Sequence, residues 1–307
     1  MGNTPRQHRF QLPMPTRSTD VSMMQQCPGR WVLTHLRSDD QAEASFFILG
    51  TVLHEAIENA IVFDLDEDWA LKGMHQAIDR ELERIYEGRV VSKKRLIETS
   101  KRGFDTMHDD AERMLKQWFW SVHPDSDKRL PIYDEYEWPP KTEVDIARGA
   151  DYSDTAYDQW GSVDAVFWAH DRESYAIVDW KSGTSRQKTD DQLHFYEYVG
   201  SHVGFGIYGC ERAWFHHLDK VRPSAIIQTA DPYPGDDAVR QRILATEAIK
   251  EGIIEDQRVT FNAGPLCNYC PVQHVCPEDG DIRNRDDNLL QLGNLLKIAR
   301  PMETIER

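Results

Sequence analysis

The sequence predicts an α/β protein in which a central mixed sheet is flanked by helices. Helical periodicity fills the first third of the chain, strand-like runs follow it, and a further helix interrupts those runs. This order of elements is typical of a mixed sheet with helical cover. A chain of 307 residues, of which 40% are hydrophobic, can bury one large core or two modest ones.

The first third of the chain is predicted to be helical. In residues 46–63, FFILGTVLHEAIENAIVF, apolar side chains recur every three to four positions, which indicates a buried amphipathic helix. Two more helices are expected at roughly 71–86 and 94–121. The second of these ends in the aromatic run WFW, which we expect to belong to the core.

Strands are predicted after Pro124, where the composition changes. The expected strands are 132–138 (IYDEYEW), 162–169 (SVDAVFWA), 175–181 (YAIVDWK), 213–218 (AWFHHL) and 224–230 (SAIIQTA). Helical spacing returns in residues 189–200 and 235–251.

Charge and composition favour a cytoplasmic protein without a membrane partner. The chain has no run of eighteen apolar residues, and its N-terminus lacks the apolar centre of a secretion signal. The formal net charge of -16 opposes nucleic-acid binding at long range, although carboxylates that bind metal would add to that count without facing DNA. Local basic runs at 88–95 and 181–188, taken alone, read as solvated helix ends or turns.

The segment 161–183, GSVDAVFWAHDRESYAIVDWKSG, holds the main chemical signal. Its two strand-like runs flank the polar stretch HDRES, which is typical of a tight antiparallel connection. If that connection has four residues, Asp164 lies opposite Asp179 or Lys181, and all three share one face. Buried carboxylates require a partner or a cation, and oxygen ligands suit Mg²⁺ or Mn²⁺. A structural Asp–Lys ion pair beside an unrelated Asp is the alternative.

Two helices could add polar groups to this hairpin. Gly50 and His54 are one turn apart on the first helix, where His54 could present an imidazole to the same metal and Gly50 permits close packing. Gln192 and Tyr196 are one turn apart on the helix after the hairpin, where they could order a phosphate or Lys181. Taken alone, His54 reads as a core histidine whose hydrogen bonds are satisfied, and Gln192 and Tyr196 read as polar residues at the edge of the core.

Three cysteines lie within ten positions in CNYCPVQHVC, spaced C-x2-C-x5-C as Cys267, Cys270 and Cys276. An odd total of five cysteines in a chain without a secretion signal favours metal or cluster ligation over disulfides. Cys210 lies between expected core elements and reads as a buried free thiol. Cys27, in the loop before the helical region, is therefore the expected fourth ligand.

Four motifs in order resemble the RecB-type branch of the PD-(D/E)XK nucleases. They are GxxxH (Gly50 to His54), GSVDAV with Asp164, IVDWK with Asp179 and Lys181, and QLHFY with Gln192 and Tyr196. Asp179 stands where many such enzymes carry Glu, and RecB-type members commonly use Asp there. The resemblance implies that His54, Asp164, Asp179 and the backbone carbonyl of Trp180 bind Mg²⁺ or Mn²⁺. It also implies that Lys181 holds the attacking water and stabilises charge on the phosphate. Glu135 and Glu137, on the preceding expected strand, are candidates to support these ligands.

One cysteine before these motifs and three after them is a layout similar to the iron-sulfur staple of AddB-type and CRISPR-associated RecB-like nucleases. That resemblance implies a 4Fe-4S cluster on Cys27, Cys267, Cys270 and Cys276. A structural zinc at the same residues is the alternative, and His274 as a replacement ligand is a third. The staple would close a very long loop and so hold the two ends of the chain together.

We therefore expect a single nuclease domain over residues 1–307. Its expected parts are an iron-sulfur staple (1–45 with 262–283), a helical region (46–125), a PD-(D/E)XK core (130–251) and a C-terminal tail (284–307). The expected activity is metal-dependent exonucleolytic hydrolysis of DNA, from single-stranded ends, in recombination or end processing in a bacterial cell or phage-infected host. A nuclease subunit of a larger CRISPR-adaptation or helicase-nuclease complex and a non-catalytic DNA-binding protein are the alternatives, and the sequence leaves open whether the protein is an oligomer.

Overall fold

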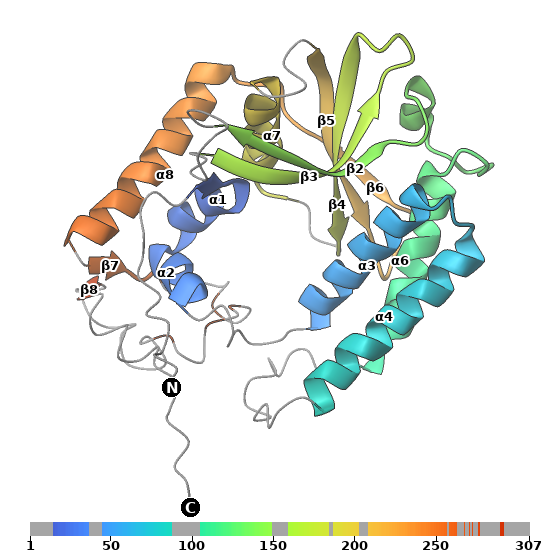
Figure 1. Ribbon diagram of the computed structural model, residues 1–307, viewed down its shortest axis with the longest axis horizontal. Helices are drawn as coiled ribbons and strands as arrows, with labels where there is room; N and C mark the ends of the chain where they lie inside the picture. The colour runs from blue at the N-terminus through green and yellow to red at the C-terminus, as the bar shows by residue number, and fades with distance from the viewer. Residues whose placement is uncertain are drawn as a thin grey trace, which may run out of the picture. The chain divides into compact units, whose positions relative to one another are not determined.

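A computed structural model gives the fold of the chain in two compact units (Figure 1). It describes residues 15–36, 45–87, 105–148, 159–183, 187–202, 208–256, 258–262, 267, 270, 272, 276 and 289–291. The unit that we call the sheet unit comprises residues 43–148 and 159–239. The unit that we call the terminal unit comprises residues 1–42, 149–158 and 240–307, and so draws on both ends of the chain.

The sheet unit begins with helices, continues with strands, and has one further helix between strands. In chain order its elements are α3 (Ser45–Val62), α4 (Glu67–Glu87), α6 (Met107–Val122), the 3-10 helix η2 (Pro131–Glu135), β2 (Lys141–Arg148), β3 (Gln159–Trp168), β4 (Ser174–Ser182), α7 (Asp191–Ser201), β5 (Gly209–Leu218) and β6 (Ile226–Thr229). Within this unit β2, β3 and β4 pair antiparallel in that order, β4 pairs parallel with β5, and β5 pairs antiparallel with β6. The parallel step passes through α7, as a parallel pair requires. The predicted mixed sheet flanked by helices is confirmed.

The core of the sheet unit lies between three helices and the sheet. Helices α3, α4 and α6 contact one another and run side by side in Figure 1. Helix α3 is long and apolar enough to cross a membrane, but half of it is buried inside the molecule. Its buried positions join a cluster that includes Phe167 of β3 and Val178 and Trp180 of β4. The apolar character of α3 is therefore accounted for by core packing.

The β3–β4 hairpin has the predicted four-residue connection. The pairing runs from Ala165 opposite Val178 to Trp168 opposite Tyr175. The N–H of Ala169 then donates to the carbonyl of Ser174 at 3.0 Å, which leaves residues 170–173 as the loop. Continuing this pairing by one residue places Asp164 opposite Asp179, which is one of the two predicted registers.

Residues 132–138 do not form the predicted strand, and a strand that was not predicted follows them. Pro131 starts the 3-10 helix η2, and only Tyr136 forms an isolated bridge, to Ala169. Proline favours the first turn of a helix, and the buried tyrosines Tyr133 and Tyr136 are spaced by one 3-10 turn. Strand β2 lies between the predicted strands 132–138 and 162–169, in a stretch for which we predicted no element. Part of the predicted helix 94–121 lies outside the described residues, and α6 covers the rest from Met107.

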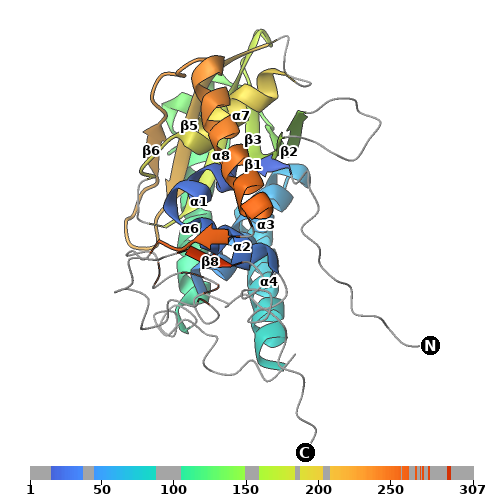
Figure 2. The same cartoon turned by 90° about the vertical axis from the view of Figure 1, so that its left-hand side faces the viewer.

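The terminal unit brings residues from the two ends of the sequence together. Its elements are β1 (Thr16–Arg17), α1 (Ser18–Gln26), α2 (Pro28–Leu36), α8 (Asp236–Asp256, in this unit from Arg240), β7 (Arg258–Thr260) and β8 (Leu289–Gln291). The β7–β8 ladder lies beside α2 (Figure 2). Trp31 of α2 and Phe261 after β7 share one hydrophobic cluster. Gly29 has no room for a side chain, because an added Cβ would lie 2.3 Å from the Phe261 ring.

A buried ion pair also joins the two ends in the terminal unit. The Lys250 ammonium of α8 lies 2.7 Å from the Asp20 carboxylate of α1 and 3.2 Å from the Thr16 hydroxyl. The other oxygen of Asp20 accepts a hydrogen bond from the Trp31 indole at 3.1 Å. Both charged side chains are almost fully buried, at 3% and 4% exposure, so each depends on the other to offset its desolvation.

Candidate active site

The two hairpin carboxylates lie on neighbouring strands, where β3 and β4 present them side by side. One Asp164 oxygen accepts a hydrogen bond from the backbone N–H of Trp180 at 2.7 Å, which fixes β3's carboxylate to β4. The Asp164 side chain is 12% exposed. Burial, together with the nearby Asp179 carboxylate, raises the pKa of Asp164 well above its usual range. This carboxylate therefore lies where a cation would lower the free energy of its charged form.

Helix α3 brings His54 to the same hairpin. Gly50, one turn earlier, allows the approach, because an added Cβ there would lie 3.1 Å from the Ser182 hydroxyl of β4. His54 Nε2 lies 2.9 Å from the Trp180 carbonyl oxygen, and a carbonyl only accepts, so we assign the proton to Nε2. Burial lowers the pKa of His54, which favours the neutral ring. The Nδ1 lone pair then faces the Asp164 carboxylate, 3.6 Å away.

Lys181, Asp179, Gln192 and Tyr196 form a connected network. The Lys181 ammonium pairs with the Asp179 carboxylate, which is 1% exposed. The Gln192 side-chain oxygen accepts a hydrogen bond from Lys181 at 2.9 Å, and its NH₂ group donates to Asp179 and to the Tyr196 hydroxyl, both at 2.7 Å. Gly161 of β3 permits this packing, since an added Cβ would lie 3.1 Å from the Tyr196 ring. The network fixes the lysine beside the hairpin carboxylates.

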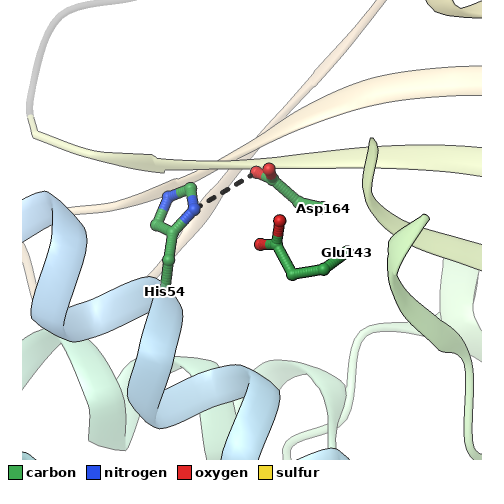
Figure 3. Close-up of side chains that lie close together, drawn as sticks. All are labelled: His54, Glu143 and Asp164. Atoms are coloured by element: carbon green, nitrogen blue, oxygen red, sulfur yellow. Dashed lines mark ion pairs between the residues drawn. The ribbon is translucent and has the colours of Figure 1, made fainter. Parts of the chain in front are cut away.

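Glu143 is a further site residue that the sequence reasoning missed. A nitrogen of His54 and carboxylate oxygens of Glu143 and Asp164 lie within 4.8 Å of one another. The three side chains converge from α3, β2 and β3 (Figure 3). The alternation of Thr142, Val144 and Ile146 is the period-two signal that could have identified β2, although not the pairing with β3 that brings this glutamate to the site.

The other two glutamates proposed as supports lie elsewhere. Glu137 forms an ion pair with Arg172 at 2.8 Å, and Glu135 forms one with Arg212 at 3.1 Å. Both pairs are at exposed positions outside the network described above. Their observed partners are thus arginines, and the strand on which we expected them is absent at 132–138.

The donor set fits a divalent cation. Carboxylate oxygens are the ligands that Mg²⁺ and Mn²⁺ prefer, and an imidazole nitrogen adds affinity for Mn²⁺. A histidine that binds metal usually donates its other N–H to a carbonyl or carboxylate, as His54 does to Trp180. His54, Glu143 and Asp164 therefore have the chemistry and the spacing of cation ligands.

The four predicted cluster ligands lie in the terminal unit. Cys27, Cys270 and Cys276 pack against the cluster of Trp31 and Phe261 described above. Burial raises the pKa of the Cys270 thiol, and the neighbouring Cys27 and Cys267 add to that shift. None of the five cysteines, all of which lie among the described residues, forms a disulfide.

The fifth cysteine, Cys210, lies on β5 in the sheet unit, whereas the other four belong to the terminal unit. Burial raises the pKa of its thiol, which makes it an unreactive group at neutral pH. Cys210 forms no disulfide, as expected, but it is half-buried rather than fully buried as we predicted.

Comparisons with known proteins bear on this site. The sequence matches the PD-(D/E)XK nuclease superfamily over residues 18–277. A search of curated proteins finds no match. A solved structure from Eubacterium rectale, described as a "putative exonuclease", is 11% identical, with a TM-score of 0.45 and coverage of 83% of this chain and 86% of that one. A second solved structure, SSO0001, is 17% identical, with a TM-score of 0.26 and coverage of 45% and 60%. On the match that spans both hairpin carboxylates, Lys181 and the four cysteines predicted to hold a cluster, the chain belongs to the PD-(D/E)XK nuclease superfamily.

Proposed function

We propose that the protein is a metal-dependent DNA exonuclease of the RecB type that hydrolyses phosphodiester bonds from single-stranded ends. The observation that carries this proposal is the convergence of His54, Asp164, Asp179 and Lys181 at one hairpin. Membership of the superfamily supports nuclease activity. The preference for single-stranded ends and a place in recombination or end processing follow from the resemblance to CRISPR-associated RecB-like exonucleases.

The proposed roles follow from the contacts of each side chain. A bound divalent cation lowers the pKa of a water ligand and offsets charge on the phosphoryl oxygens. His54 and Asp164 are positioned to hold it, and Asp179 and the Trp180 carbonyl lie next to them on β4. Lys181, oriented by Gln192 and Asp179, supplies a positive charge to the attacking water or to a phosphate oxygen.

The activity is tested with end-labelled and internally labelled DNA, single- and double-stranded, in Mn²⁺, Mg²⁺ or chelator. We expect release of the end label from linear single strands only with metal, and no cleavage of circular single strands. Asp179→Asn and Lys181→Met should abolish release, while Glu173→Gln in the exposed β3–β4 loop should not. Cleavage of circles would make the enzyme an endonuclease. Metal-independent binding without cleavage in any condition would contradict the enzyme and favour a DNA-binding protein, and cleavage only with a partner would favour a complex subunit.

We also propose that Cys27, Cys267, Cys270 and Cys276 hold a 4Fe-4S cluster that clasps the two ends of the chain. Three of these thiols pack against one apolar cluster, and Cys27 and Cys267 are close enough to Cys270 to raise its pKa electrostatically. When bound, such a cluster is held by four thiolates and contributes to the stability of the fold around it. Arg30, on α2, is also near Cys270, where its charge favours a thiolate.

The cluster is tested by anaerobic purification, followed by iron, sulfide and zinc analysis and by visible absorbance. Wild-type protein should be brown and contain iron and sulfide. Cys27→Ser should lose both, whereas Cys210→Ser, which removes the one cysteine outside this set, should retain them. A colourless protein with stoichiometric zinc would replace the iron-sulfur proposal by the zinc alternative.

A further inference from the structure

Three carboxylates lie in one row across three neighbouring strands of the sheet. Glu143 falls between the pairs Thr142 to Ala165 and Val144 to Val163, so it lies opposite Asp164. Continuing the β3–β4 pairing places Asp164 opposite Asp179. Like charges directly opposite each other destabilise a sheet. Such a row therefore requires positive charge to be stable when ionised.

Among the described lysines, Lys181 forms an ion pair with one end of that row, Asp179. Lys181 pairs with Asp179, and both Asp179 oxygens are engaged, one by Lys181 and one by Gln192. Within the described part of the chain, the ion-pair partner of Asp164 is His54, and no lysine or arginine pairs with Glu143. Among the described residues, the space between Glu143, Asp164 and His54 Nδ1 is thus lined by electron-pair donors with which no lysine or arginine forms an ion pair.

The backbone conformation of Glu143 and a hydrogen bond to its side chain fix where its carboxylate lies. Its φ is +44°, in the left-handed region, although it lies inside strand β2. A non-glycine residue in that region raises the free energy of the folded state. The Ser162 hydroxyl donates to Glu143 Oε2 at 3.1 Å and holds the carboxylate over β3. The strand thus keeps a strained residue that faces Asp164 and His54.

We propose that Glu143 is a ligand of the divalent cation, together with His54 Nδ1 and Asp164. The inference rests on the proposed nuclease function and extends it, because the resemblance to known nucleases assigned no role to this glutamate. It places the cation on the β2 side of Asp164, where Mg²⁺ or Mn²⁺ would meet two carboxylates and an imidazole. Asp179, engaged by Lys181 and Gln192, then borders this position from β4.

Manganese binding to the DNA-free protein, measured by calorimetry and by the electron paramagnetic resonance of free Mn²⁺, tests this assignment. Glu143→Gln should weaken Mn²⁺ binding on the order of tenfold or more, since it replaces an anionic ligand by a neutral amide. Asp164→Asn, which removes the shared ligand, should weaken it at least as much. Glu55→Gln is the matched control, because it removes one negative charge next to His54 from an exposed side chain that pairs with Arg80.

Binding by Glu143→Gln within twofold of wild type, beside loss in Asp164→Asn, would overturn the assignment of Glu143 and leave the nuclease proposal intact. Wild-type protein that binds no Mn²⁺ and releases no nucleotide would overturn both. The two failures are thus distinguishable in one set of titrations.

A glycine variant separates ligation from backbone strain. Glu143→Gly removes the carboxylate and relieves the left-handed residue, because glycine adopts positive φ without penalty. The metal-free variant should therefore melt at a higher temperature than metal-free wild type, whereas the rise that Mn²⁺ causes in wild type should be absent. A full Mn²⁺-dependent rise in Glu143→Gly would contradict the proposal.

Discussion

The amide oxygen of Gln192 on α7 accepts a hydrogen bond from the Lys181 ammonium on β4 at 2.9 Å. The same amide donates to Asp179 through its nitrogen, so one side chain bridges the two members of an ion pair. An amide suits this position because it carries both an acceptor for the lysine and donors for the carboxylate. The α7 helix thereby determines where the lysine charge lies in the site.

Gln192→Ala should lower the cleavage rate on the order of tenfold to a hundredfold, because Lys181 loses the contact that orients it. Mn²⁺ affinity should change little, since Gln192 does not contact His54, Glu143 or Asp164 in the described structure. Single-turnover cleavage and Mn²⁺ titration measure the two quantities separately. Gln76→Ala, at an exposed position of α4, is the control. Equal rates for Gln192→Ala and wild type would show that Lys181 is oriented by Asp179 alone.

Lys181→Met should lower the free energy of unfolding of the metal-free protein by about 3 kcal/mol. The methionine keeps the apolar stem but leaves the Asp179 carboxylate, 1% exposed, without its cationic partner. Urea unfolding followed by circular dichroism measures this loss. The double variant Asp179→Asn, Lys181→Met should recover much of it, because no buried charge then lacks a partner. Equal stability of the single and double variants would contradict this account.

Glu197→Gln should make stability less dependent on pH. Burial, reinforced by the charge of Asp236, raises the pKa of Glu197 to about 7 from a usual value of 4.5. Between these values the folded protein holds a proton that the unfolded chain has lost, so wild-type stability falls as the pH rises from about 4.5 to 7 and stays lower above that.

At pH 8 the glutamine variant should therefore be more stable than wild type, on the order of 1 kcal/mol once solvent screening of this partly exposed side chain is allowed for. The difference should vanish towards pH 4. Urea titrations at several pH values check this, with Glu173→Gln in the β3–β4 loop as an exposed control. A difference that grows as the pH falls would have the wrong sign.

Lys250→Met should destabilise the terminal unit by about 3 to 5 kcal/mol, because it leaves the buried Asp20 carboxylate unpaired. Asp20→Leu combined with Lys250→Met should be much less harmful than either change alone. Unfolding monitored by the fluorescence of Trp31, whose indole donates to Asp20, reports on this unit, although other tryptophans contribute to the signal. Additive losses in the double variant would contradict a direct coupling.

The sequence predicted the α3 helix and the β3–β4 hairpin well because local pattern and final environment agree there. The apolar period of α3 matches its buried face, and the polar stretch at 170–173 can form only a short connection. The loop length placed Asp164 on the face shared by Asp179 and Lys181, since side chains alternate along a strand, and the observed pairing selects Asp179 as the residue opposite it.

Glu143 and the 3-10 helix η2 could not be predicted in the same way. The pattern of 132–138 alternates as in a strand, yet its tyrosines are buried through contacts with Phe167 and Trp214, which lie far away in sequence. Glu143 becomes part of the site only because β2 pairs with β3, and its left-handed backbone conformation leaves no signature in residue type. Contacts between residues far apart in the sequence thus determined both the 3-10 helix and the position of Glu143 in the site.

The shared cluster of Trp31 and Phe261 has a consequence for how the chain folds as it is made. The two residues are 230 positions apart, 261 minus 31, so α1 and α2 leave the ribosome long before their apolar partners exist. At ordinary rates of synthesis that interval is on the order of ten seconds or more. Trp31 of α2 therefore stays without this apolar partner until the segment that contains Phe261 has been synthesised.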